Sequence, residues 1–349
     1  MAERTLTGKQ TQLRLAMELR PPAGDTSRTV DSVIPRRGYC YAAMAAVLWA
    51  ISGSSAKFLF QEGITPYQLV QMRVTLAAAL LFVWMLFRSR TLLRISPKDL
   101  LYFAALGTLG LAMVQFTYFL TISKIKVAAA ILLEYLAPMF IAIHALAFAR
   151  ERLTRTTLVA IAAATTGCYL VVGGYNLDLL AMNKEGIISG VFSAITFAWY
   201  SVYGERGMRR YHPWTVLFHA MLFAALFWNV AHFFWGPAPP PLESLRHGYS
   251  LIQWAWIIYI ATLGTIIPFG FYFEGINLIR STRASITATL EPITAGIVSF
   301  VFLGEALEPL QILGAVMVIG AVIALQLRQE HDDHTPALIR TRAEAAESG

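Results

Sequence analysis

The residues most able to do chemistry are ionisable side chains inside long apolar stretches. Glu134, Glu291 and Arg73 lie deep in such stretches, and Lys57 is shallower. Charged groups are expensive inside a bilayer, so they usually face a cavity or one another. We predict that Glu134 pairs with Arg73 or Lys57 and gates the outer half of a path. The alternative is a static ion pair that holds helices together, with Lys57 extending toward the interface.

Two prolines lie beside the carboxylates. Glu134 comes four residues before Pro138, and Glu291 directly precedes Pro292. A proline lacks the N–H that the carbonyl four residues earlier would accept, here those of Glu134 and Ala288. A freed carbonyl at membrane depth needs a cavity, a water or another side chain. A carboxylate at such a break could carry protons or bind substrate, and Glu291 is the first candidate. The alternatives are a structural hydrogen bond and a kink that serves shape alone.

Further candidates are polar or aromatic side chains at mid-depth. The small face around Ser52 either packs closely against another helix or lines a cavity. The polar side chains need hydrogen-bond partners, which makes them candidates to line a cavity. For the aromatic rings at mid-depth, the alternative is packing between helices. The histidine is either a packing residue, a titrating group or a partner of Glu291. These candidates are Trp49, Ser52, Gln115, Tyr118, Trp199, Tyr203 and His219.

Several chemistries have no support in the sequence. It contains no HExxH, CxxC or His-rich pattern, and no Walker motif. We therefore expect no metal site, no cofactor, no direct use of ATP and no enzymatic activity. No basic cluster accompanies a nucleic-acid-binding fold, so we expect no nucleic-acid partner.

The elements that must position these residues are apolar helices. The chain is 56% hydrophobic and 14% charged, whereas soluble domains are about 25% charged. About 20 apolar residues in an α-helix span the roughly 30 Å of a bilayer core. We therefore predict an all-α integral membrane protein with ten transmembrane helices. The predicted spans are 39–61, 66–88, 99–121, 127–149, 156–175, 186–206, 213–236, 251–275, 282–303 and 308–327.

The basic residues predict an orientation. If the N-terminus is cytoplasmic, most of the 28 Lys and Arg residues fall in the tails and loops of the inner side. Cytoplasmic loops carry such an excess, so we predict that both termini are cytoplasmic. Residues 1–37 and 329–349 are then polar cytoplasmic tails.

The chain also matches itself at an offset of 154 residues. Thr108-Leu109-Gly110 corresponds to Thr262-Leu263-Gly264, and Pro138 to Pro292. We predict two repeats, 38–175 and 186–328, of five spans each. Because five is odd, the second repeat enters the membrane from the opposite side. Inverted repeats recur in transporters that alternate access around a midplane site.

These features resemble the drug/metabolite transporter superfamily, and specifically its EamA-type ten-helix members. Each proline precedes a glutamate by 13 residues, Pro138 before Glu151 and Pro292 before Glu305. Leu48-Trp49-Ala50 with Lys57 and Tyr272-Phe273-Glu274-Gly275 complete the match. The resemblance implies ten helices, cytoplasmic ends, and export or exchange of small metabolites, amino acids or drugs.

We thus expect a secondary transporter in the cytoplasmic membrane. Its expected cargo is a small amino-acid-like or drug-like metabolite, moved outward by alternating access, with protons as a candidate coupling ion. The alternative is a non-transporting membrane sensor or a lipid-handling protein on the same fold. The expected partners are the small-molecule substrate and the lipid bilayer, and a homodimer is an open alternative.

Overall fold

Helices make up the regular secondary structure of the residues that the computed structural model describes. These are residues 26–125, 127–148, 154–171, 174–175, 183–237, 239–303 and 308–327, and none of them forms a strand. A helix satisfies its own backbone hydrogen bonds, so it is the natural element for so apolar a sequence. Residues 1–25 and 329–349 of the predicted tails lie outside the described residues, as do Glu151 and Glu305.

The helices up to residue 171 begin with the longest, α2, and vary in length after it. The predicted span 66–88 has the bounds of α3, whereas α2 begins at Thr26, well before the predicted 39. The elements are α2 (Thr26–Gln61), α3 (Pro66–Arg88), η1 (Arg90–Leu93), η2 (Pro97–Asp99), α4 (Leu100–Ala105), η3 (Leu106–Ala112), α5 (Met113–Lys124), α6 (Val127–Glu134), α7 (Ala137–Ala147) and α8 (Arg155–Val171).

The helices after residue 183 follow a similar order. They are α10 (Lys184–Met208), α11 (Pro213–Val230), η4 (Ala231–Phe233), α12 (Glu243–Arg246), α13 (Leu251–Ala261), η5 (Thr262–Ile266), α14 (Ile267–Ala288), α15 (Leu290–Leu303) and α16 (Pro309–Leu327).

Six helical stretches among the described residues are long and apolar enough to cross a membrane. Two shorter apolar helices, Ala137–Ala147 and Pro309–Ala324, accompany them. The prediction of a helical membrane protein is therefore supported. The six long stretches are Arg36–Gln61, Pro66–Arg88, Pro97–Lys124, Lys184–Met208, Pro213–Phe233 and Leu251–Ala288.

Two of the predicted spans are interrupted. Within 127–149, α6 ends at Glu134 and α7 begins at Ala137. Within 282–303, α14 ends at Ala288 and α15 begins at Leu290. Both interruptions lie just before a proline, where the missing N–H weakens the helix. The span predicted to end at 275 continues a few residues further to Arg280, where α14 bends with a φ of 70°, just before the predicted start of the next span at 282.

The repeated Thr-Leu-Gly sequence marks two wider helical turns. Thr108-Leu109-Gly110 lies in η3 and Thr262-Leu263-Gly264 lies in η5, and both elements are π-helical. A π-helical turn leaves some carbonyls without their usual partners and is frequent at functional sites. Equivalent stretches of sequence therefore adopt the same unusual backbone.

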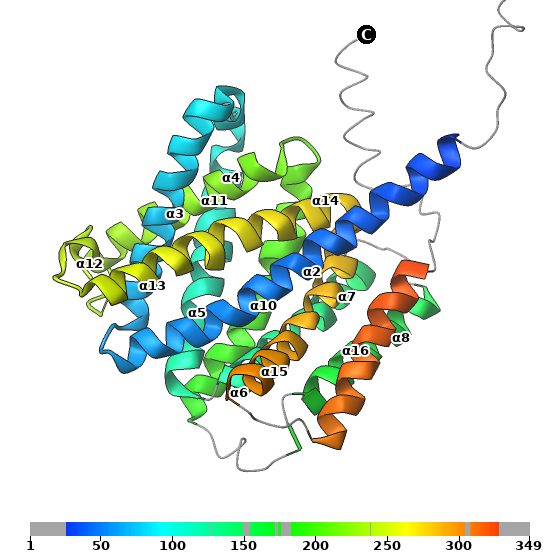
Figure 1. Cartoon of the computed structure of the whole chain (residues 1–349). Coiled ribbons are helices and arrows are strands. Elements are labelled where there is room, and N and C mark those ends of the chain that lie inside the picture. The colour runs from blue at the N-terminus through cyan, green and yellow to red at the C-terminus, as the bar shows by residue number, and fades with distance from the viewer. Residues whose placement is uncertain are drawn as a thin grey trace, which may run out of the picture.

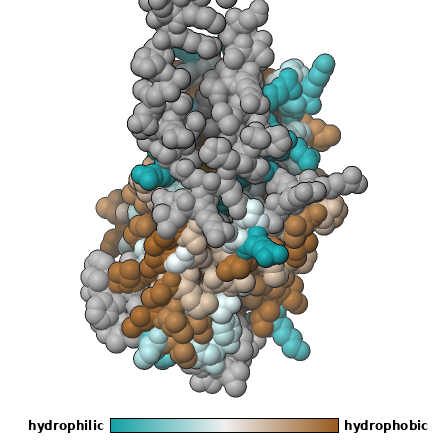
Figure 2. Space-filling model, turned by 90° about the vertical axis from the view of Figure 1, so that its right-hand side faces the viewer, coloured by the Kyte–Doolittle hydropathy of each residue, from teal (hydrophilic) through white to brown (hydrophobic). Residues whose placement is uncertain are grey.

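The helices pack in pairs that join distant parts of the chain. Helix α2 crosses the molecule beside α14, α8 pairs with α16, and α5 lies against α10 (Figure 1). Figure 2 shows mostly apolar side chains on the visible flank, with the hydrophilic ones toward its ends. Side chains such as Ile188, Phe192 and Val316 are exposed. This surface suits contact with lipid, and the polar groups lie inside.

Candidate functional site

A cavity inside the bundle collects most of the polar groups that the sequence singled out. Its volume is about 40 Å³, below the usual range of about 300–1,000 Å³ for small-molecule sites, so in this conformation it has room for water-sized groups only. Helices α2, α3, α5, α6, α10, α14 and α15 all contribute to its wall. The lining residues are Trp49, Ser52, Gly53, Arg73, Val114, Gln115, Tyr118, Glu134, Tyr135, Phe197, Phe269 and Glu291.

Aromatic rings form the apolar part of the wall. The Trp49 ring centroid lies 5.0 Å from that of Phe269, 6.0 Å from that of Phe197 and 5.3 Å from that of Tyr272. These tilted and edge-on contacts fix the indole. One turn further along α2, Ser52 packs on Gly264 so closely that a Cβ there would collide with its hydroxyl. The small face of α2 therefore both packs against η5 and lines the cavity.

Arg73 is buried and is held by the π-helical turn η5. Its Nε donates to Oγ1 of Thr265 at 2.6 Å, and its second guanidinium nitrogen donates to the carbonyl of Gly264 at 3.0 Å. Its guanidinium carbon lies 4.7 Å from the ring centroid of Phe119. The fork shape of arginine suits two acceptors and a stacked ring at once. This arrangement brings a cation to the cavity wall.

The predicted pairing of Glu134 with a cation is not formed among the described residues. Lys57 donates to the carbonyls of Ile122 at 2.6 Å and Ile125 at 3.2 Å, where it neutralises the end of α5. Glu134 accepts instead from the hydroxyl of Ser193 at 3.1 Å. The terminal carbonyls of a helix lack backbone partners, so they attract the lysine more strongly than the distant carboxylate does.

Glu291 is bound by a tyrosine from the other interrupted helix. The hydroxyl of Tyr135 lies 2.7 Å from Oε2 of Glu291 and 2.6 Å from the carbonyl of Ala288. Ala288 is four residues before Pro292, so its carbonyl is the one that the proline deprives of a partner. The predicted need of a freed carbonyl for a side chain is therefore met here by Tyr135.

Other polar atoms in the cavity wall have no partner in the described part of the chain. They are Nε1 of Trp49, both amide atoms of Gln115 and the hydroxyl of Tyr118. Gln115 is only 2% exposed. Buried polar groups are nearly always hydrogen-bonded, so these atoms are available to a ligand or to water. Together they offer donors and an acceptor beside two carboxyl groups and a guanidinium.

Three of the predicted candidates lie away from the cavity. Trp199 stacks on Tyr203 with centroids 4.4 Å apart, and the carbonyl of Tyr203 accepts a hydrogen bond from Tyr102. His219 bonds the carbonyl of Thr215 through Nδ1 at 2.9 Å, and its ring packs on aromatic neighbours. The packing alternative describes all three, and no contact joins His219 to Glu291.

Sequence reasoning missed several lining residues. Val114, Phe197 and Phe269 are ordinary apolar residues in apolar helices, and no pattern distinguishes them from core residues. Tyr135 could have been found, because it follows Glu134 directly and lies three residues before Pro138. A hydroxyl at a predicted helix break is a natural partner for a freed carbonyl.

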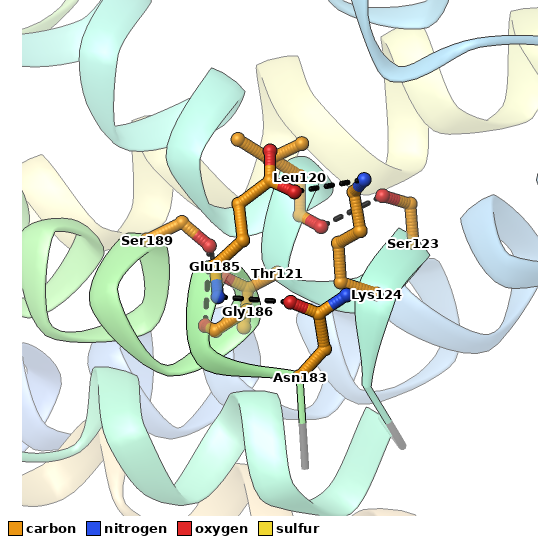
Figure 3. A network of polar contacts seen from close by, with 8 residues as sticks. All are labelled: Leu120, Thr121, Ser123, Lys124, Asn183, Glu185, Gly186 and Ser189. Atoms are coloured by element: carbon orange, nitrogen blue, oxygen red, sulfur yellow. Dashed lines mark hydrogen bonds and ion pairs between the residues drawn. The ribbon is translucent and has the colours of Figure 1, made fainter.

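Polar contacts also join the two halves of the chain at one end of α10. Lys124 forms an ion pair with Glu185 at 2.9 Å, and the hydroxyls of Thr121 and Ser189 are 2.8 Å apart. Figure 3 shows these side chains between the end of α5 and the start of α10, which Asn183 caps. They tie the polar-rich α5 to the second half.

At the opposite end of α10, Glu205 holds the bend in α14. One carboxylate oxygen lies 3.3 Å from Nε of Arg280, and the other accepts from the backbone N–H of Ser281 at 2.9 Å. The positive φ of Arg280 is unusual for a residue with a side chain. Glu205 therefore caps the helical segment that follows the bend.

Comparison with known proteins identifies relatives over most of the chain. The sequence profile of the EamA-like transporter family matches residues 36–173 and 184–326. The uncharacterized inner membrane transporter YicL of Salmonella typhimurium is 27% identical, over 84% of this chain and 96% of its own length. An uncharacterized transporter of Archaeoglobus fulgidus is 30% identical, over 62% of this chain and 74% of its own length.

Two more distant similarities concern a named exporter and a solved fold. The threonine/homoserine exporter RhtA of Escherichia coli is 23% identical, over 61% of this chain and 65% of its own length. A protein of known crystal structure superposes with a TM-score of 0.62 at 18% identity, over 88% of this chain and 98% of its own. The second similarity shows a shared fold.

Proposed function

The chain belongs to the EamA-like transporter family, and on that premise we propose that it is a secondary transporter for a small metabolite. It is a multi-pass membrane protein, and relatives that it resembles are named as transporters. The proposed carrier lies in the cytoplasmic membrane with both termini inside, exports its substrate and works by alternating access.

The observation that carries this proposal is the cavity between the helices. A guanidinium, two carboxyl groups and four unpartnered polar atoms line one cavity inside an apolar bundle. Burial of such groups is costly, and a static core has no use for them. A small polar cargo that binds there would satisfy them.

The same groups favour an amino-acid-like substrate over an apolar drug. Arg73 can hold a carboxylate, and Glu134 and Glu291 can accept hydrogen bonds from an ammonium group. The aromatic wall around Trp49 can pack against the rest of the molecule, including a cation. The relative named as a threonine/homoserine exporter acts on compounds with both charges.

Ten helices in two inverted repeats remain part of this proposal. The family profile matches twice, on either side of residues 174–183. The π-helical turns and the proline-linked breaks recur at the same offset of 154 residues. Broken helices beside a midplane site are typical of carriers built from such repeats.

Proton coupling completes the proposed mechanism. Two carboxyl groups share a cavity with one cation, so binding of a cationic group and binding of protons would compete there. A carrier of this kind releases a proton on one side when its substrate binds and takes one up on the other.

Counterflow into proteoliposomes tests the proposal. Vesicles preloaded with unlabelled L-threonine should accumulate radiolabelled L-threonine with the wild type and much less with Glu291→Gln. Glu62→Gln, an exposed carboxylate outside the cavity, serves as the matched control and should retain flux. If neither L-threonine nor any of a panel of amino acids and cationic dyes exchanges, the non-transporting sensor or lipid-handling alternative is favoured.

A further inference from the structure

We propose that Tyr135 couples the protonation of Glu291 to the joint between the two interrupted helices, and that Glu291 carries a proton in this conformation. Tyr135 lies in the break between α6 and α7, and is 6% exposed. Its hydroxyl reaches across to the break between α14 and α15. It thereby joins a helix of the first half to two of the second.

Three oxygen atoms meet at Tyr135, and the number of hydrogens that they share determines the protonation of Glu291. The Tyr135 hydroxyl oxygen lies 2.6 Å from the carbonyl oxygen of Ala288 and 2.7 Å from Oε2 of Glu291. Both distances are those of O–H···O hydrogen bonds. A tyrosine hydroxyl has one hydrogen, a carbonyl has none and an ionised carboxylate has none. Two bonds therefore need a second hydrogen, which only a protonated Glu291 can supply.

The two hydrogen bonds of Tyr135 then run in one direction, from the carboxylic acid to the carbonyl. Glu291 donates from Oε2 to the Tyr135 oxygen, and Tyr135 donates to the carbonyl of Ala288. Every oxygen at the joint is then satisfied, including the carbonyl that Pro292 leaves without an N–H. If Glu291 were ionised, the tyrosine could donate to only one of the two, and the other pair would be two acceptors in contact.

The position related by the offset of 154 residues makes no such contact. Thr289 stands there in the second half, and its hydroxyl donates to the carbonyl of Ile286 at 2.6 Å, within its own helix. The carboxylates also differ, because Glu134 corresponds to Ala288 and Glu291 to Ala137. Tyr135 of the first half therefore links the two helix breaks, whereas the equivalent Thr289 of the second half does not.

Other titratable groups face Glu291 without a direct hydrogen bond to it in the described part of the chain. Glu134 on α6, Tyr118 on α5 and Cys168 on α8 are near enough to interact electrostatically. Arg73 on α3 lines the same cavity but is bound to η5. Glu134 adds negative charge beside Glu291, which favours a shared proton over two ionised carboxylates. Tyr135 is therefore the group that senses the proton on Glu291 through a direct bond.

Loss of the proton would change the joint. When the Glu291 proton passes to water or to a basic group in the cavity, the carboxylate becomes the stronger acceptor. The Tyr135 hydrogen then turns to Glu291, and the carbonyl of Ala288 loses its partner. Tyr135 then stays bound to α15 through Glu291 whereas the end of α14 is released, so the break between α14 and α15 can change its geometry. The role of this change in transport rests on the proposed carrier function, whereas the protonation of Glu291 does not.

Infrared spectroscopy of the purified protein in nanodiscs tests the inference without a substrate. Near neutral pH, the wild type should show a C=O stretching band of a protonated carboxylic acid, and Glu291→Gln should lack it. Tyr135→Phe should keep the band and move it to higher frequency, because the acid loses its hydrogen-bond acceptor. Tyr259→Phe, a tyrosine of α13 outside the cavity, should leave the band in place.

Two results would overturn the inference. One is a wild type with no band that depends on Glu291, and the other is a band that Tyr135→Phe does not move. If Glu291→Gln does not fold, Glu134→Gln and Glu205→Gln assign the band by elimination, because a band that survives in both variants comes from neither Glu134 nor the buried Glu205. A normal infrared result without any flux in proteoliposomes would reject the carrier function and leave the proton link intact.

Discussion

Arginine should be required at position 73 even where a lysine would keep the charge. The guanidinium donates to Thr265 and to the carbonyl of Gly264 while it stacks on Phe119. In Arg73→Lys, one ammonium on a flexible stem cannot hold both acceptors in that geometry and also cover the ring. At least one bond to the π-helical turn η5 is then lost.

The size of the loss follows from these contacts. A hydrogen bond between helices in a membrane is worth about 0.6 kcal/mol on average and about 1.7 kcal/mol at most. A cation over an aromatic ring adds about 0.5–2 kcal/mol. We therefore expect Arg73→Lys to lower the free energy of unfolding by roughly 1–3 kcal/mol. Arg73→Met should lower it further, because it leaves the carbonyl of Gly264 without any partner.

Thermal unfolding in detergent, followed by tryptophan fluorescence, measures this order. The expected melting temperatures fall from wild type to Arg73→Lys to Arg73→Met. Arg88→Lys is the matched control, because Arg88 lies on the same helix and is exposed. It should melt as the wild type does. A melting temperature of Arg73→Lys equal to that of the wild type would refute the role of the arginine fork in holding η5.

Three further changes have expected outcomes. Gly53→Ala should reduce L-threonine counterflow with little change in melting temperature, because its Cβ would lie 3.2 Å from a tyrosine hydroxyl in the cavity; Gly320→Ala, with no atom within 4 Å of its Cβ, should leave flux unchanged. Glu205→Gln should cost about 1–2 kcal/mol in thermal unfolding, because it loses its ion pair at the bend of α14; an unchanged melting temperature would contradict this. His219→Phe should lower the melting temperature through its lost bond but leave counterflow per folded molecule unchanged, and a selective loss of flux would contradict the packing role.

The sequence alone determined where the costly groups lie along the chain. Ionisable residues in apolar stretches are rare for an energetic reason, so Glu134, Glu291 and Arg73 could be selected without a structure. The prolines likewise placed the helix breaks within a few residues, because the missing N–H acts locally. The apolar stretches indicated a helical membrane protein for the same reason, since hydropathy is a local property.

The tertiary structure decided which groups meet. Lys57 binds the carbonyls at the end of α5 rather than Glu134, and Tyr135 rather than His219 binds Glu291. Helices in this chain are apolar on most sides, so their sequences carry little information about which face turns inward. Close packing between helices determines which face of each helix turns inward, as where Ser52 meets Gly264. Those contacts join residues far apart in the chain, and no local pattern records them.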